Sequence, residues 1–194
     1  MSYLDTSVPS DDARRHHEAD LAQKGYVSNY TKLFALAPAS YDAWLALNGS
    51  VKAGMDLRRY ELVTLAVARR LRSSYCSLAH GSVLANTFFP AESVRRIATD
   101  HRDAELDEVD VSIMDFAEKV ATDATSITPS DVDALREHGL DDREIFQIVL
   151  ATAVRCFFST VLDATGTEAD AQFRTSLDPA LQQVLTVGRS IATT

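Results

Sequence analysis

Apolar residues recur along this chain at helical spacing, in segments that are separated by glycine, proline or short polar stretches. Side chains three or four residues apart fall on one face of an α-helix. The pattern predicts helices over residues 11–24, 27–37, 40–54, 57–71, 74–88, 90–99, 109–124, 129–138, 143–164 and 179–191. No segment shows the strict alternation or the turn signals of a β-hairpin. The sequence therefore predicts an all-α protein of roughly nine or ten helices.

Two of the predicted helices begin with strong capping signals. Thr128 precedes a proline and stands three residues before Asp131, and Asp141 stands three residues before Glu144. A small polar residue followed three positions later by an acid is typical of a capping box. Gly166 is placed to end the long apolar helix over 143–164.

Two helices show which side chains should face the core. In the helix over 57–71, the residues expected to face inward are Leu62, Leu65, Ala66 and Ala68. In the helix over 40–54, the expected apolar side consists of Trp44, Leu45 and Leu47.

Length and composition indicate one soluble domain over 1–194. The chain has 194 residues, of which 46% are hydrophobic and 24% charged, and this is ordinary for a globular protein. Within the domain, 1–20 reads as an arm and first helix, 57–88 as a central helix pair, and 167–194 as a C-terminal extension. Two distant cysteines do not suggest a disulfide framework.

The net charge and the hydropathy of the chain limit which classes of partner and which cellular location are expected. The net charge of −9 argues against nucleic acid or an anionic membrane, because both need a basic face. The chain opens without the basic and apolar regions of a signal peptide, and no apolar run approaches the length that spans a bilayer. The sequence therefore predicts a cytoplasmic protein.

The chemistry is concentrated between residues 61 and 85. Cys76 and His80 stand four residues apart and so share one helix face. Ser73 or Ser74 is a plausible N-cap, which places Cys76 in the first turn, where the helix macrodipole favours a thiolate. Glu61, on the preceding helix, can reach the same place. A thiol, an imidazole and a carboxylate there predict a thiol-based redox or proton-transfer site.

Each of these residues also has a structural interpretation. A lone cysteine on an apolar helix is often only packing, and a single histidine is often only hydrogen-bonded. Glu61 can equally pair with Arg58 or Arg69, and Ser73 can be simply a helix cap. No metal site is expected, because His80 lacks further ligands at plausible spacing.

Other candidates lie beside or outside this stretch. Tyr75 can donate a hydrogen bond to a substrate or wedge the helix junction. Cys156 stands among Val154, Phe157 and Phe158 and is expected to be inert core. The pair His16-His17 is expected on a solvated surface, because adjacent residues do not share a helix face.

Together, Glu61, Cys76 and His80 resemble the active-site pattern of alkylhydroperoxidase D (AhpD) and the wider carboxymuconolactone decarboxylase-like superfamily. The stretch 24–30, the Leu36-Ala37-Pro38 turn and the stretch 163–166 resemble its "peroxidase-related" branch, so that the resemblance covers about 20–166. It implies an AhpD-like helical bundle and a homo-oligomer (dimer, trimer or hexamer). Candidate interfaces are the helix after Asp178 and the region 26–44.

Two departures from the family pattern concern the reaction. Ser73 stands where the family has the first cysteine of Cys-x-x-Cys, and Tyr75 stands where AhpD has a second histidine. Cys76 matches the cysteine that attacks peroxide, but no local disulfide can form. The resemblance thus implies hydroperoxide reduction through Cys76, with Glu61 and His80 as a proton relay. An external thiol, or Cys156, would serve as reductant, and the lipoylated partner of AhpD is not carried over.

Two other functions remain open. One is a cysteine-independent enzyme in which His80 and Glu61 transfer protons on a small carboxylated or lactone substrate, as carboxymuconolactone decarboxylases do. The other is a non-catalytic binding or oxidant-sensing protein. No haem, flavin or nucleotide signature is present in the sequence, and no cofactor is expected.

Overall fold

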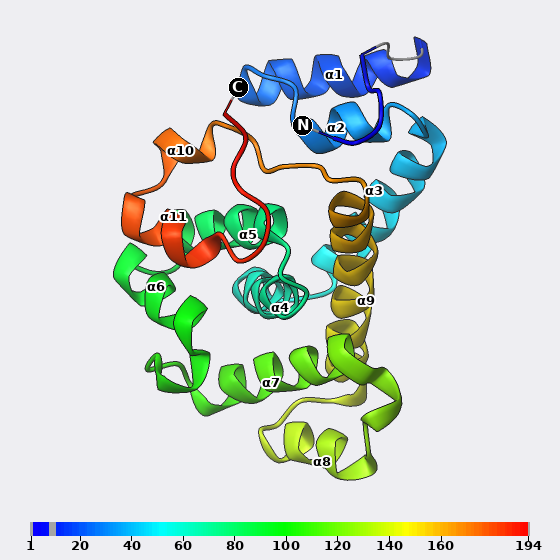
Figure 1. The fold of residues 1–194 in the computed structure, drawn as a ribbon. Coiled ribbons are helices and arrows are strands. Elements are labelled where there is room, and N and C mark those ends of the chain that lie inside the picture. Colours follow the sequence, from blue (N-terminus) through cyan, green and yellow to red (C-terminus); the bar gives the residue numbers. More distant parts are fainter. Residues whose placement is uncertain (1, 8–10, 194) are drawn as a thin grey trace.

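The chain folds into a single all-α domain. The computed structural model describes residues 2–7 and 11–193, and Figure 1 shows their arrangement. The α-helices of the described residues are α1 (Asp11–Lys24), α2 (Asn29–Phe34), α3 (Pro38–Ala53), α4 (Leu57–Arg70), α5 (Ser74–Thr87), α6 (Ala91–Thr99), α7 (Glu108–Asp123), α8 (Pro129–Glu137), α9 (Asp142–Ala164), α10 (Phe173–Ser176) and α11 (Pro179–Leu185). Nine of them have seven residues or more, and the same residues contain no β-strand, so the predicted class is confirmed.

The structure differs from the predicted elements mainly near the C-terminus. The short helix α10 was not predicted, and α11 ends at Leu185, so that Ile191 lies outside it. Residues 186–193 instead run back along the molecule, where Arg174 donates hydrogen bonds to the carbonyls of Ile191 and Ala192. A parallel bridge joins Ile191 to Ala169. Contacts distant in sequence, rather than local propensity, decide this conformation.

Helix α4 is the centre of the fold (Figure 1). Every residue from Tyr60 to Ala68 is buried, and α5, α7 and α9 pack around it. The predicted inward positions Leu62, Leu65, Ala66 and Ala68 are confirmed. Since Val63 and Val67 on the other side are buried as well, the central part of α4 is enclosed on all sides.

The turn between α4 and α5 sets the angle at which the two helices meet. The N–H of Arg72 donates to the carbonyl of Arg69, and the N–H of Ser73 donates to that of Ala68. Arg72 has a φ of 57°, so the turn is a Schellman motif with arginine at the left-handed position that glycine usually fills. The C-terminal segment supports it, because the N–H of Gly188 donates to the Ser74 hydroxyl.

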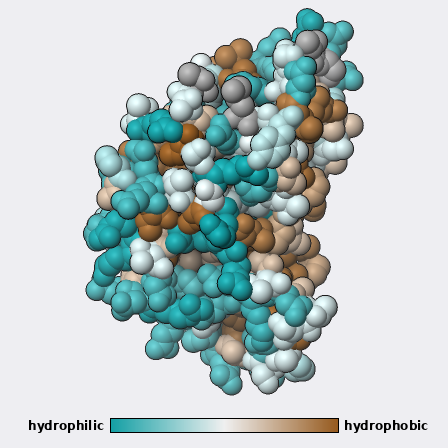
Figure 2. All heavy atoms as spheres, viewed as in Figure 1, coloured by the Kyte–Doolittle hydropathy of each residue, from teal (hydrophilic) through white to brown (hydrophobic). Residues whose placement is uncertain are grey.

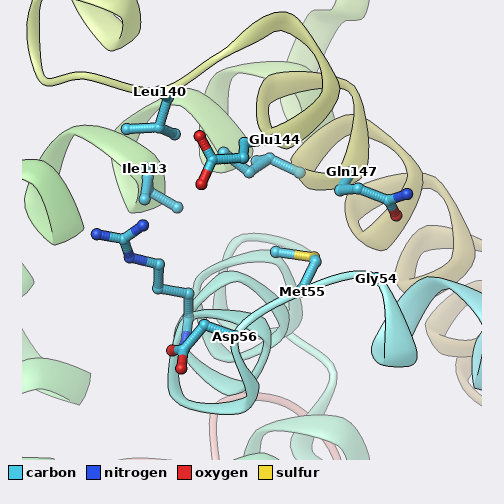
Figure 3. A pocket seen from close by; sticks show the side chains of 9 residues that line it. Gly54, Met55, Asp56, Ile113, Leu140, Glu144 and Gln147 are labelled. Atoms are coloured by element: carbon cyan, nitrogen blue, oxygen red, sulfur yellow. The ribbon is translucent and has the colours of Figure 1, made fainter.

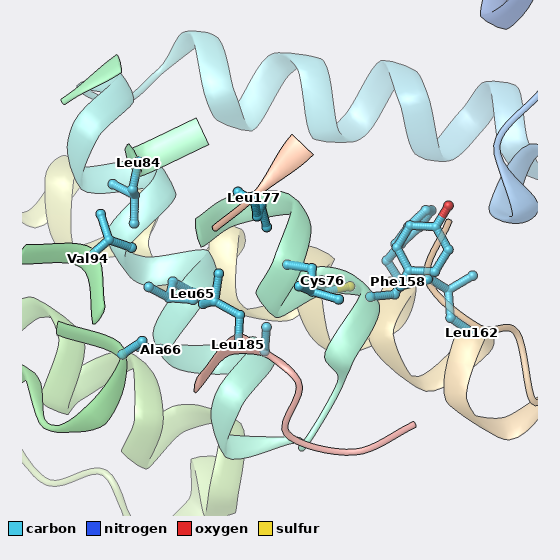
Figure 4. Close-up of a cluster of buried hydrophobic side chains, with 14 of the residues drawn as sticks. Leu65, Ala66, Cys76, Leu84, Val94, Phe158, Leu162, Leu177 and Leu185 are labelled. Carbon is cyan, nitrogen blue, oxygen red and sulfur yellow. The ribbon is translucent and has the colours of Figure 1, made fainter. Parts of the chain in front are cut away.

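Two hydrophobic clusters form the core, on either side of α4. The first joins α5, α6 and α11 to the end of α9, and Figure 4 shows Cys76 within it. The second joins α7, α8 and the start of α9. Leu181 and Leu185 of α11 are buried in the first cluster, so this helix packs on its own chain.

The predicted apolar side of α3 was right for Trp44, which packs against both hydrophobic clusters, and wrong for Leu45 and Leu47. Leu45 and Leu47 are 40% and 49% exposed, whereas Tyr41 and Val51 are buried. The helix is rotated because Tyr41 stacks on Phe34 of α2 at 4.9 Å between ring centroids. In Figure 2, hydrophobic side chains gather along the right-hand edge of the molecule, over α3 and α9.

Helix α9 also corrects the expectation about apolar runs. By length and composition it could cross a membrane. Half of the apolar window of this helix is buried inside the fold. At its start the predicted capping box is confirmed, since the side chains of Asp141 and Glu144 each accept from the other's backbone N–H.

Candidate active site

The predicted carboxylate and imidazole lie in direct contact. Glu61 of α4 is 1% exposed, and its Oε2 lies 2.6 Å from Nδ1 of His80 on α5. Its other oxygen, Oε1, accepts from Nζ of Lys52 on α3 at 3.2 Å. Both oxygens of this buried carboxylate are therefore satisfied, one by the imidazole and one by an ammonium group.

The alternative partners of Glu61 are engaged elsewhere. Arg58 forms an ion pair with the buried Asp110, and Arg69 donates to the carbonyl of Val184 at 2.7 Å. The interpretation in which Glu61 only balances one of these arginines is wrong.

Burial and neighbouring charges determine the protonation of the pair. Burial, reinforced by the positive charge of Arg155, lowers the pKa of His80 to about 4. Glu61 acts in the opposite direction, but its effect is smaller. Burial alone would raise the pKa of Glu61. The hydrogen bond with His80 and the charge of Lys52 have a larger effect in the opposite direction, so the net result is a lowered pKa. Near neutral pH, His80 is thus a neutral imidazole whose Nδ1–H donates to an ionised Glu61. Its Nε2 lone pair is free to accept a proton.

Cys76 lies in the first turn of α5, as predicted, with Ser73 at the N-cap position. It is 1% exposed, and its Sγ accepts from Nη1 of Arg155 on α9 at 3.4 Å. Figure 4 shows the sulfur on the side of α5 that faces Phe158 of α9. The thiol therefore lies at a helix N-terminus and in contact with a guanidinium group.

Arg155 itself is buried without a carboxylate partner among the described residues. Burial alone would lower the pKa of Arg155. The Cys76 sulfur and the Tyr60 hydroxyl have a larger effect in the opposite direction, so the net result is a raised pKa. A full positive charge therefore stands beside the thiol. Sequence reasoning missed this residue, although Arg155 is the single charged residue between 145 and 162 and was a usable signal.

A cavity of about 270 Å³ joins these groups. Its lining comprises Tyr30, Tyr41, Trp44, Leu45, Asn48, Lys52, Tyr60, Tyr75, Cys76, Ala79, His80, Arg155 and Phe158. Glu61 stands behind His80 and is not part of the lining. The helices α2, α3, α4, α5 and α9 all contribute, so the site exists only in the folded chain.

The two supporting candidates, Tyr75 and Ser73, differ in how they are placed relative to the cavity. Tyr75 lines the cavity, but its hydroxyl donates to Oδ2 of Asp170 at 2.6 Å. Burial, with the charge of Asp170, raises the pKa of Tyr75 well above its ordinary value. Ser73 is fully buried outside the lining, and its hydroxyl makes no capping hydrogen bond.

Other candidates lie away from the cavity. Cys156 is half-buried in the second cluster, on a different face of α9 from Arg155, and burial raises its pKa. His16 and His17 are half-buried rather than solvated, and His16 packs edge-on against Tyr41. Over 2–7 and 11–193, no group of three or more metal-ligating side chains is placed to hold a metal ion.

A second cavity of about 70 Å³ lies between the start of α4, α7 and α9 (Figure 3). Its lining contains neither cysteine nor histidine. Its two carboxylates, Asp56 and Glu144, accept hydrogen bonds at the starts of α4 and α9. These groups stabilise helix ends, and the cavity lined by Cys76 and His80 remains the candidate active site.

Comparisons with known proteins agree with this architecture. No family model and no curated protein sequence matches the chain. Among solved structures, it is similar to an uncharacterised peroxidase-related protein from Silicibacter sp. TM1040, with 24% identity, a TM-score of 0.80 and coverage of 90% of this chain and 94% of that one. An AhpD-core, peroxidase-related protein from Ralstonia eutropha JMP134 gives 22% identity, a TM-score of 0.79 and coverage of 89% and 93%.

A third similar structure shows that this fold supports other activities. It is a cysteine-to-alanine variant of the debrominase Bmp8 in complex with 2,3,4-tribromopyrrole, with 14% identity, a TM-score of 0.75 and coverage of 93% and 100%. Activity therefore has to be argued from the site. The chain has the AhpD-like fold of the peroxidase-related proteins.

Proposed function

We propose that this protein is an AhpD-like thiol peroxidase that reduces small hydroperoxides through Cys76. The observation that carries the proposal is the contact between the Cys76 sulfur and the buried Arg155 guanidinium. It lies in a cavity that His80 also lines, and His80 is held by Glu61. A thiol reacts with peroxides as its thiolate, and His80 is the base in this cavity that can accept the thiol proton.

The reaction balances with the groups present. Neutral His80 takes the Cys76 proton at Nε2, and the imidazolium is stabilised by Glu61. The thiolate attacks the terminal oxygen of the hydroperoxide, so that an S–O bond forms and the O–O bond breaks. The departing alkoxide takes the proton from His80, leaving an alcohol and Cys76 sulfenic acid.

Regeneration needs an external thiol. Because Ser73 replaces the partner cysteine and Cys156 lies outside the cavity, no second thiol lines the site. One external thiol attacks the sulfenic acid and releases water. A second thiol then reduces the mixed disulfide, restores Cys76 and leaves the two external thiols joined as a disulfide.

The test is to titrate reduced protein with cumene hydroperoxide and follow oxidation by intact-mass spectrometry with dimedone trapping. We expect one sulfenic acid at Cys76, loss of this product in Cys76→Ser, and retention in the matched control Cys156→Ser. Turnover with dithiothreitol should also depend on Cys76. Equal peroxide consumption by wild type and Cys76→Ser would refute the proposal, and oxidation without turnover would instead indicate an oxidant sensor.

One observation favours a second candidate, a cysteine-independent proton-transfer enzyme. His80 is a neutral base oriented by a carboxylate, and the cations of Lys52 and Arg155 line the same cavity. These groups suit a small carboxylated or lactone substrate. Activity that survives alkylation of Cys76 but is lost in His80→Gln would favour this candidate over the peroxidase.

A further inference from the structure

The charge of the cavity lining is opposite to the charge of the protein. The chain has a net charge of −9, yet the lining contains two cations, Lys52 and Arg155, and no aspartate or glutamate. Two carboxylates, Glu61 and Asp170, stand behind lining residues and are hydrogen-bonded to His80 and Tyr75. The charged side chains that line the cavity are therefore all cationic in an acidic molecule, and a cationic lining attracts anions.

The two cations are not equivalent. Lys52 is 44% exposed and already paired with Glu61, whereas Arg155 is 4% exposed and has no acidic partner in the described part of the chain. A buried charge is ordinarily paired, because an isolated one is costly to desolvate. The partners of the Arg155 guanidinium are the Cys76 sulfur at Nη1 and the Tyr60 hydroxyl, and neither is a carboxylate.

Two buried donors on cavity-lining residues lack acceptors. Nε of Arg155 and the indole Nε1 of Trp44 are both buried without a hydrogen-bond partner. An unsatisfied buried donor costs roughly 1–3 kcal/mol, so each such group in a native fold calls for an explanation. Both donors belong to side chains that line the cavity, although the two nitrogen atoms themselves are not exposed to it.

The walls of the cavity are aromatic. Tyr30, Tyr41, Trp44, Tyr75 and Phe158 all contribute to the lining. Trp44 stacks on Phe158 at 4.1 Å between centroids, and Tyr30 meets Phe158 edge-on at 5.5 Å. The volume of about 270 Å³ falls just below the roughly 300–1,000 Å³ typical of drug-sized ligands, so it suits a molecule of about one ring.

We propose that the cavity binds a small aromatic anion, a single ring that carries a carboxylate or phenolate oxygen. The anionic oxygen accepts from Arg155, and the ring packs against Trp44 and Phe158. This inference rests on the proposed function in using the same cavity, and it specifies the organic group that a hydroperoxide substrate of that site would carry. A binding measurement tests it without any thiol chemistry, so the two proposals can fail separately.

The chain carries its own reporter, because Trp44 is its single tryptophan. Wild-type protein is titrated near neutral pH with benzoate, 4-hydroxybenzoate, benzyl alcohol and acetate, and Trp44 fluorescence is followed. Calorimetry provides a second readout. We expect saturable binding of the aromatic anions, at least about tenfold tighter than benzyl alcohol or acetate, because neither matches both the charge and the ring. Equal affinity for benzoate and benzyl alcohol, or for benzoate and acetate, would overturn the proposal.

Arginine variants assign the anion contact. Arg155→Met should weaken benzoate binding by about tenfold or more while changing benzyl alcohol binding less than about twofold. The matched control Arg69→Met removes a partly buried arginine outside the cavity and should bind benzoate like wild type. Unchanged benzoate affinity in Arg155→Met would refute the assignment. If that variant does not fold, the wild-type comparison of benzoate with benzyl alcohol still decides. Retained benzoate binding in Cys76→Ser would support this inference even if peroxidase activity is absent.

Discussion

The contact between His80 and Glu61 predicts how the stability of the fold depends on pH. The pKa of His80 is lowered from the ordinary 6.5 to about 4 in the folded protein. The unfolded chain therefore binds a proton at His80 at a higher pH than the folded chain does. Stability is fully present above the unfolded value of 6.5 and falls as the pH drops through about 4.

The size of the expected loss of stability follows from the size of the shift in the His80 pKa. The difference between 6.5 and about 4 corresponds to roughly 3 kcal/mol of unfolding free energy once the pH is below both values. Between about pH 7 and about pH 5, His80 alone should remove about 2 kcal/mol. The lowered pKa of Glu61 has its own effect at lower pH, as that carboxylate protonates below its ordinary 4.5.

The assay is urea unfolding at about pH 7 and about pH 5, for wild type and His80→Gln. Glutamine keeps a donor for Glu61 but does not titrate, so the variant should lose about 2 kcal/mol less stability over this range than wild type. His101→Gln is the matched control, because it removes another buried histidine with a carboxylate partner and keeps the His80 site intact. Identical losses in wild type and His80→Gln would refute the assigned protonation of the pair.

Three further predictions concern other parts of the molecule. Leu185→Ala should lower the unfolding free energy by about 2–5 kcal/mol, because Leu185 is fully buried where α11 packs against the first cluster. A change below about 1 kcal/mol in urea unfolding would contradict this. Ser73→Cys should form an internal disulfide with Cys76 on peroxide treatment, seen as loss of both free thiols by mass spectrometry, whereas persistent sulfenic acid would count against that pairing. Phe146 and Phe157 of α9 are 59% and 47% exposed and are expected at a self-association surface. The double variant Phe146→Glu with Phe157→Glu should therefore lower the mass measured by light scattering, and an unchanged mass would exclude this surface.

Much of the helical framework can be predicted from the sequence, because the signals that define helix ends are local. The boxes at Thr128 and Asp141 satisfy backbone groups within three residues of themselves, and the structure contains both. The spacing of Cys76 and His80 likewise follows from helix geometry alone. Helix faces were less predictable, as Leu45 and Leu47 show, since which side is buried depends on what packs against it.

The sequence by itself determined the helical class, most helix boundaries, and a cysteine and a histidine one turn apart with a glutamate on the preceding helix. Only the tertiary structure decided what these groups are chemically. It brings Arg155, 79 residues away in the chain, against the Cys76 sulfur, and Lys52 against Glu61. The physical reason is that charge state depends on burial and on neighbouring charges, which folding assembles from distant segments. His80 is a neutral base for that reason, and not because of any residue beside it in the sequence.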